Sequence, residues 1–178
     1  FVFVLGSSWP PDEKIIFPAV NEINANEFKI RMIIVPHEPT DEHIAHIQHE
    51  IPDTILLSEL IERSKSERTE QIKADINNKH IITDSIGKLL GLYRFARAAY
   101  IGGAFGAGVH SVTEPAGYGI PISCGPGYHN SPDAKVLSED NVLVHMQNKE
   151  DVLAWLQKLL SDKEYYSLAG IKAAEYVY

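Results

Sequence analysis

The chain has almost no cysteine. Its 178 residues include one, Cys124, which lies in the apolar run over residues 120–124. A single thiol excludes a disulfide framework and also a metal site built on paired cysteines. We therefore expect Cys124 to serve as a small buried hydrophobic side chain.

Positive charge and long apolar runs are scarce as well. The chain has 16 Lys and Arg against 24 Asp and Glu, a net charge of −8. A nucleic-acid-binding surface needs clustered basic residues, so this balance argues against one. No apolar run approaches the roughly 18 residues that span a bilayer, and nothing resembles a signal peptide. We expect a cytosolic chain with no nucleic-acid partner and no membrane span of its own.

Three common nucleotide-binding signatures are absent. The first apolar run is followed by GSSWPP, residues 6–11, which lacks the second and third glycines of the dinucleotide fingerprint. No Gly-Lys-Ser or Gly-Lys-Thr occurs, which excludes a P-loop. No Asp-x-Asp occurs either, so we expect a sugar-nucleotide enzyme with this sequence to work without a bridging divalent ion.

The chain does contain a regular alternation of short apolar blocks and helical patterns. The blocks are near-continuous and rich in Val and Ile, which is typical of parallel strands buried on both faces. Expected strands cover residues 1–5, 29–35, 54–57, 80–83, 98–101, 120–124 and 142–144, and expected helices begin at residue 12 or cover residues 41–49, 86–96, 113–118, 149–160 and 162–177. We predict an α/β fold, a Rossmann-like parallel sheet with helices on both faces, in a single domain over residues 1–178.

Ligands of such sheets bind where the carboxyl ends of the strands open into loops. The expected topology places four loops on one rim, over residues 6–11, 36–40, 84–88 and 102–114. In the last of these, glycines let backbone N–H groups approach an anion, and the following helix adds the partial positive charge of its N-terminus. We therefore expect a ligand site on this rim.

Ser111 and Glu114 lie three residues apart at the start of the expected helix, so both side chains can face one sugar. A carboxylate there accepts hydrogen bonds from a diol such as a ribose, while the amides of residues 106–110 face a phosphate. This arrangement suits a nucleotide. The alternative is that Glu114 only caps the helix. His110 either contacts the phosphate or is a structural histidine bonded to a carbonyl group.

Two further segments have a functional and a structural interpretation. Residues 84–88 offer a second helix N-terminus with a cation, Lys88, nearby, and an ordinary helix cap explains them equally well. His43, His46 and His49 recur at helical spacing, as metal ligands can. Their acidic neighbours favour a solvated helix face instead.

Four segments in order along the chain resemble the C-terminal half of the 3-deoxy-D-manno-octulosonic acid (Kdo) transferase family, the lipid A Kdo transferases. They are GSSWPPDE, IIVPHEP, TDSIGKLLGLY and the glycine-rich block over residues 100–130. The block is the most specific, because the family carries Gly-Gly-His-Asn-x-Leu-Glu-Pro-Ala, then Gly-x-Pro and a Phe-Gly-Pro turn. Here these read GVHSVTEPA, GIP and CGP.

The resemblance implies a two-domain GT-B glycosyltransferase whose C-terminal domain, this one, holds the CMP part of CMP-Kdo. Family members grip CMP through a Pro-Arg pair, a Met-Gly-Glu segment and an Asn-x-Leu-Glu segment. The implied nucleotide-binding residues are Pro36, His37, Ile86, Gly87, Lys88, Gly108, His110, Ser111, Val112, Thr113 and Glu114. Three of them depart from the family: His37 replaces arginine, Lys88 replaces glutamate and Ser111 replaces asparagine. At His37, an imidazole group, which titrates near neutrality, therefore stands where the family has a permanent cation.

The implied reaction is inverting transfer of Kdo from CMP-Kdo to a lipid A precursor in lipopolysaccharide biosynthesis, without a metal or other cofactor. In the family the general base is a glutamate of the N-terminal domain, which also binds the acceptor and docks on the cytoplasmic face of the bacterial inner membrane. No catalytic residue is therefore expected in this chain. Because the chain starts on an apolar run without methionine, we expect a soluble fragment of a longer protein that binds CMP weakly and catalyses nothing alone.

Two other functions stay open from the sequence. One is a GT-B transferase or epimerase that uses a UDP-sugar, which competition between CMP and UDP would distinguish. The other is a non-catalytic nucleotide-binding domain whose pocket has changed at His37, Lys88 and Ser111.

Overall fold

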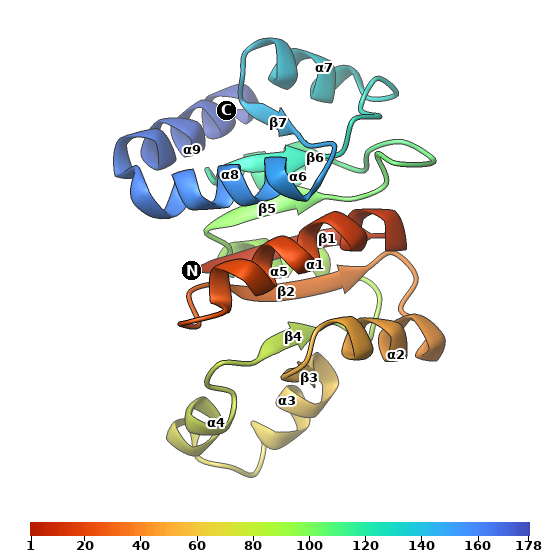
Figure 1. The fold of residues 1–178 in the computed structure, drawn as a ribbon, viewed down its shortest axis with the longest axis vertical. Helices are drawn as coiled ribbons and strands as arrows, with labels where there is room; N and C mark the ends of the chain where they lie inside the picture. The colour runs from red at the N-terminus through yellow and green to blue at the C-terminus, as the bar shows by residue number, and fades with distance from the viewer.

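The computed structural model describes residues 1–178, which form a seven-stranded sheet in the order β3-β4-β2-β1-β5-β6-β7 (Figure 1). All neighbouring strands pair in parallel. The strands are β1 (Val2–Ser8), β2 (Arg31–Pro36), β3 (Thr54–Leu56), β4 (His80–Ile82), β5 (Ala98–Ile101), β6 (Ile122–Cys124) and β7 (Leu143–His145). The predicted α/β fold with a parallel sheet is confirmed, and each of the seven expected strands overlaps an observed one.

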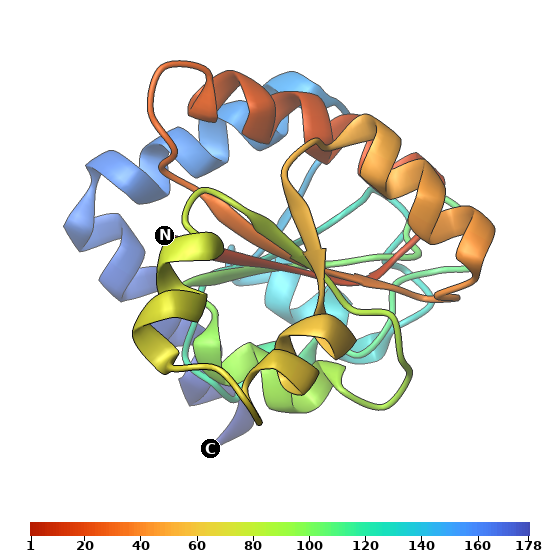
Figure 2. The same cartoon turned by 90° about the horizontal axis from the view of Figure 1, so that it is seen from below.

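Helices cover both faces of this sheet (Figure 2). They are α1 (Pro10–Asn24), α2 (Asp41–Glu50), α3 (Leu57–Arg63), α4 (Thr69–Asp75), α5 (Leu89–Leu92), α6 (Thr113–Ala116), α7 (Pro132–Glu139), α8 (Lys149–Ser161) and α9 (Lys163–Val177), with the 3-10 helix η1 (Tyr93–Phe95) directly after α5. None of them is long and apolar enough to cross a membrane.

Two hydrophobic cores lie on opposite faces of the sheet because side chains alternate along each strand. In β1, Phe3 and Leu5 join the core under α1, α2 and α8, whereas Val4 joins the core against α5, α7 and α9. In β5, Tyr100 faces the first core and Ile101 the second. Burial on both faces explains why the strands read as continuous apolar blocks.

The order of the strands reverses between β1 and β5. From β1 the chain goes to β2, then to β3 at the edge of the sheet and back to β4 between β2 and β3, and it then crosses to the other side of β1 to add β5, β6 and β7. The helices that follow these two strands, α1 and α6, pack on opposite faces of the sheet, and the carboxyl ends of β1 and β5 are the place where ligands of such folds bind.

The structure differs from the sequence-based helices in three places. The charged stretch over residues 59–73, which the sequence leaves open as a surface loop or an exposed helix, belongs to α3 and α4. The helix expected over residues 86–96 is only α5 followed by η1, and Asp84 does not cap it. Asp84 instead accepts hydrogen bonds from the backbone N–H and the hydroxyl of Ser58, in the first turn of α3. In addition, α7 was not expected, although it begins with Ser131 as its cap and Pro132 at the first position.

Candidate functional site

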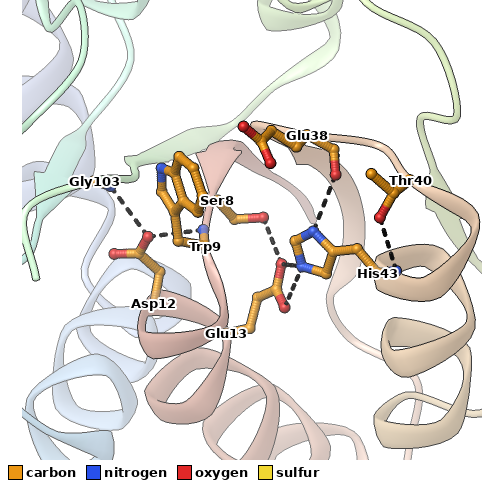
Figure 3. A network of polar contacts seen from close by, with 8 residues as sticks. All are labelled: Ser8, Trp9, Asp12, Glu13, Glu38, Thr40, His43 and Gly103. Carbon is orange, nitrogen blue, oxygen red and sulfur yellow. Dashed lines mark hydrogen bonds and ion pairs between the residues drawn. The ribbon is translucent and has the colours of Figure 1, made fainter. Parts of the chain in front are cut away.

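A buried carboxylate joins the two loops at the point where the strand order reverses. Asp12, in the first turn of α1, is fully buried. It accepts hydrogen bonds from the backbone N–H of Trp9 at 3.0 Å and of Gly103 at 3.1 Å (Figure 3). It also accepts one from the Tyr100 hydroxyl at 2.8 Å. Burial raises the pKa of Asp12, and these three hydrogen bonds oppose that rise. Asp12 therefore fixes the loop after β1 against the loop after β5.

A second buried carboxylate joins the end of β1 to α2, the helix after β2. Glu13 is 1% exposed, accepts a hydrogen bond from the Ser8 hydroxyl at 2.8 Å, and has both oxygens 3.0 Å from Nε2 of His43 (Figure 3). The other ring nitrogen of His43 lies 3.2 Å from the carbonyl oxygen of Glu38. Both ring nitrogens of His43 therefore face oxygen atoms of the protein.

This network also corrects one expectation and excludes one kind of chemistry. His43 does not lie on a solvated helix face, since its side chain is 12% exposed, although His46 and His49 are exposed. In nucleophilic triads the histidine lies between the serine and the acid. Here Glu13 lies between Ser8 and His43, so the histidine does not contact the serine and the order of a triad is absent.

Three rings stack across the rim from three different loops. The ring of His37 lies between Trp9, at 4.7 Å between centroids, and His110, at 4.5 Å. The backbone N–H of His37 donates to the Ser8 carbonyl at 2.9 Å, and this bond holds the loop after β2 against the end of β1. Burial and the neighbouring His37 lower the pKa of His110, and Asp12 acts in the opposite direction. The predicted residues His37 and His110 are therefore in direct contact.

The amides of the glycine-rich loop are not available to a phosphate as expected. Of the five amides over residues 106–110, four already donate hydrogen bonds inside the protein. The bonds are Gly106 and Gly108 to the Gly103 carbonyl, His110 to the Gly102 carbonyl and Val109 to the Asn130 side chain. The next two amides, of Ser111 and Val112, donate none within the protein. Apart from the Ala107 amide, the free donors therefore lie at the entry to α6.

These loops enclose a pocket of about 250 Å³ on the α5 and α6 side of the rim. Glu114 is exposed there and makes no hydrogen bond or ion pair with the protein. The lining residues are Ser7, Leu89, Tyr93, Ile101, His110, Ser111 and Glu114. Three of the predicted binding residues, His110, Ser111 and Glu114, thus share one pocket, and Leu89 brings the segment after β4 to the same place.

The other predicted binding residues surround this pocket or lie beside it. Ile86, Gly87 and Lys88 are exposed in the turn before α5, and of this segment only Leu89 reaches the pocket wall. Four others lie in the elements beside the pocket and do not line it. Pro36 ends β2, Gly108 and Val112 belong to the loop after β5, and Thr113 begins α6.

Sequence reasoning missed several residues of the site. Trp9 stacks on His37, Ser7 and Ile101 line the pocket at the ends of β1 and β5, and Tyr93 lines it from η1. The sequence predicts Tyr93 only as part of the apolar helix over residues 86–96. The signal that was available is the position of Ser7 and Trp9 directly after the first strand, where ligands of such folds bind.

A larger hollow of about 550 Å³ lies between α1 and α2 and includes Pro10 and Pro11 at the start of α1. Its charged side chains include two carboxylates, Glu13 and Glu50, and one cation, Lys14. We favour the smaller pocket as the functional site because it lies where the strand order reverses and contains side chains without partners in the protein.

Comparison with known proteins shows what the chain is similar to. No family model matches it. The 3-deoxy-D-manno-octulosonic acid transferase of Rickettsia prowazekii is 29% identical over 161 residues, which are 90% of this chain and 33% of that protein. The chain therefore spans about one third of the length of this curated relative.

Solved structures show the same fold. The C-terminal CMP-Kdo binding domain of WaaA from Acinetobacter baumannii superposes with a TM-score of 0.78 at 21% identity, covering 99% of this chain and 88% of that one. A putative UDP-N-acetylglucosamine 2-epimerase from Listeria monocytogenes gives 0.57 at 14% identity, covering 97% of this chain and 39% of that one. The chain is thus similar, over nine tenths of its length, to part of the Kdo transferases, and it has the fold of the C-terminal domain of these GT-B glycosyltransferases.

Proposed function

We propose that this chain is the donor-binding domain of a glycosyltransferase that moves Kdo from CMP-Kdo to a lipid A precursor in lipopolysaccharide biosynthesis. Similarity to the Kdo transferases over 90% of the chain supports Kdo transfer as the reaction of the parent protein. The observation that carries the assignment to a site is the pocket that His110, Ser111 and Glu114 share at the carboxyl edge of the sheet.

The pocket offers both kinds of group that a nucleotide needs. Glu114 is a carboxylate without a protein partner and can accept hydrogen bonds from the two ribose hydroxyls. The hydroxyl groups of Ser7 and Ser111 and the amides of Ser111 and Val112 can donate to the phosphate. Charge grows on that phosphate as CMP leaves, so each donor aimed at it lowers the barrier by about 2 to 4 kcal/mol, the size of one oxyanion donor.

The remaining steps are assigned to the part of the parent protein outside this chain. The proposed general base and the acceptor site belong to the N-terminal domain, and the parent works at the cytoplasmic face of the inner membrane through that domain. The proposed transfer uses no metal ion or other cofactor. This chain alone is therefore expected to bind CMP and to transfer no Kdo.

Calorimetric titration of this chain with CMP and with UDP tests the proposal. We expect CMP to bind weakly, UDP to bind more weakly still, and Glu114→Gln to reduce the affinity for CMP by about tenfold, because a carboxylate bonded to a diol is worth about 1.5 kcal/mol or more. Glu50→Gln, on α2, serves as the matched control and should bind CMP as the wild type does.

Two results would contradict this assignment. No heat with millimolar CMP, together with unchanged behaviour of Glu114→Gln, would remove nucleotide binding at this pocket. Tighter binding of UDP than of CMP at the same site would replace the donor by a uridine nucleotide and favour a transferase or epimerase that uses a UDP-sugar.

A further inference from the structure

Tyr93 is a buried tyrosine whose hydroxyl group has no partner in the protein. The residue is 1% exposed, its ring belongs to the core against α5, α7 and α9, and it lines the rim pocket beside Ser7 and Glu114. The hydroxyl oxygen itself is not among the fully buried polar atoms without a partner, so it is open to the pocket that the residue lines. The hydrogen bonds of this protein include those of the Tyr100, Tyr118 and Tyr176 hydroxyls but none from Tyr93.

The fold keeps space for this hydroxyl at the end of β1. A Cβ atom on Gly6 would lie 2.4 Å from the Tyr93 oxygen, closer than real contacts allow. The absence of a side chain at Gly6 therefore lets the phenol reach the strand end next to Ser7. The ring fills core volume, which phenylalanine would do as well, so the packing does not account for the oxygen atom.

The pocket needs such a donor because the helix after β1 offers none. In related folds the N-terminus of that helix binds the phosphate through its amides. Here the first two positions of α1 are Pro10 and Pro11, which have no N–H, and the amides of Asp12 and Glu13 already donate to the Trp9 carbonyl. Hydroxyl groups are thus the donors that remain at the end of β1.

The phenol is suited to an anionic partner. Burial and the nearby charge of Glu114 raise the pKa of Tyr93, so the hydroxyl keeps its proton and can donate it in a hydrogen bond. The pocket wall contains no Lys or Arg, and Glu114 is its only carboxylate. With Glu114 engaged by the ribose, the phosphate is the acceptor-rich part of the ligand that the phenol can serve.

We propose that the Tyr93 hydroxyl donates a hydrogen bond to the phosphate of the bound nucleotide, in the space that Gly6 leaves open. This inference rests on the proposed nucleotide-binding function and adds a specificity-determining residue to it. Tyr93 would distinguish a nucleoside monophosphate from the nucleoside alone.

Titration of the wild type and of Tyr93→Phe with CMP and with cytidine tests the inference. We expect the substitution to weaken CMP binding about tenfold, which is about 1.4 kcal/mol at 25 °C, and to leave cytidine binding unchanged. The thermal unfolding midpoint should stay at the wild-type value, because the oxygen has no protein partner to lose. Tyr118→Phe is the matched control, since its hydroxyl already donates to the Leu90 carbonyl at 3.0 Å, and it should keep the affinity for CMP.

Three outcomes would overturn the inference. Unchanged CMP affinity in Tyr93→Phe would remove the contact while leaving the proposed function intact. An equal loss of CMP and cytidine affinity would place the contact on the nucleoside instead of the phosphate. Failure of the wild type to bind CMP at all would remove the proposed function together with this inference.

Discussion

Two glutamates of this chain show the difference between a residue that serves the fold and one that is free to serve a ligand. Glu13 is buried and fully engaged by Ser8 and His43, so its loss would leave a histidine and a serine without their acceptor. Glu114 is exposed, has no partner in the protein and faces a pocket. The sequence alone made Glu114 a candidate but gave no sign of the role of Glu13.

At the same scale, His80 should control how stability depends on pH. The ring is 4% exposed and its Nδ1 accepts a hydrogen bond from the Met32 amide at 2.9 Å, which requires the neutral form. Burial lowers the pKa of His80 to about 4. The unfolded chain binds this proton near pH 6.5, so the unfolded state holds more protons between the two values, and stability falls as the pH drops from 6.5 towards 4.

The lowered pKa of His80 corresponds to a loss of about 3 kcal/mol in the free energy of unfolding as the pH falls from 6.5 to 4. His80→Gln keeps an acceptor but removes the titration, so we expect urea unfolding of this variant to show a flatter dependence of the free energy of unfolding on pH. His49→Gln, at a side chain that is 85% exposed, should keep the wild-type dependence. A wild-type slope in His80→Gln would contradict this assignment.

At the scale of elements, the close approach of the loops after β1 and β5 shapes the rim. A Cβ atom on Gly102 would lie 2.2 Å from the Ser7 carbonyl oxygen, which is backbone and cannot move independently. Gly102→Ala should therefore lower the free energy of unfolding by about 2 to 3 kcal/mol, as overpacking does, when measured by urea denaturation.

Gly106→Ala in the same loop provides the control for that prediction. A Cβ atom there has no neighbour within 4 Å, so the change should stay within about 0.5 kcal/mol. Equal effects at the two glycines would show that the loops do not approach each other as closely as described.

The elements also show what local sequence can and cannot predict. The strands were predictable because each is a short apolar block buried on both faces, as in residues 98–101. The hydrogen bonds of the amides in the glycine-rich loop are not predictable from local sequence. One of their acceptors is the Asn130 side chain, which lies twenty-one residues from Val109. The sequence predicts Asp84 as a cap of the following helix, whereas its side chain bonds to the first turn of α3, which only the pairing of β3 with β4 brings near.

At the scale of the whole molecule, the parallel topology turns separate motifs into one site. The order of strands and helices predicted that the loops after β1, β2, β4 and β5 share an edge, and the structure brings His37, Leu89 and Glu114 around one rim. The buried networks of Asp12 and Glu13 were not predictable, because they depend on distances between loops that only the folded chain defines. Our central claim is that this rim holds the nucleotide of CMP-Kdo.

NMR titration of the ¹⁵N-labelled chain with CMP tests that claim most directly. The account predicts that amide shifts change for residues of the rim pocket, such as Ser7, Ser111 and Glu114, and stay unchanged for Lys14 and Asn21 in the hollow between α1 and α2. Changes confined to Lys14, Asn21 and their neighbours, or no change at millimolar CMP, would contradict it.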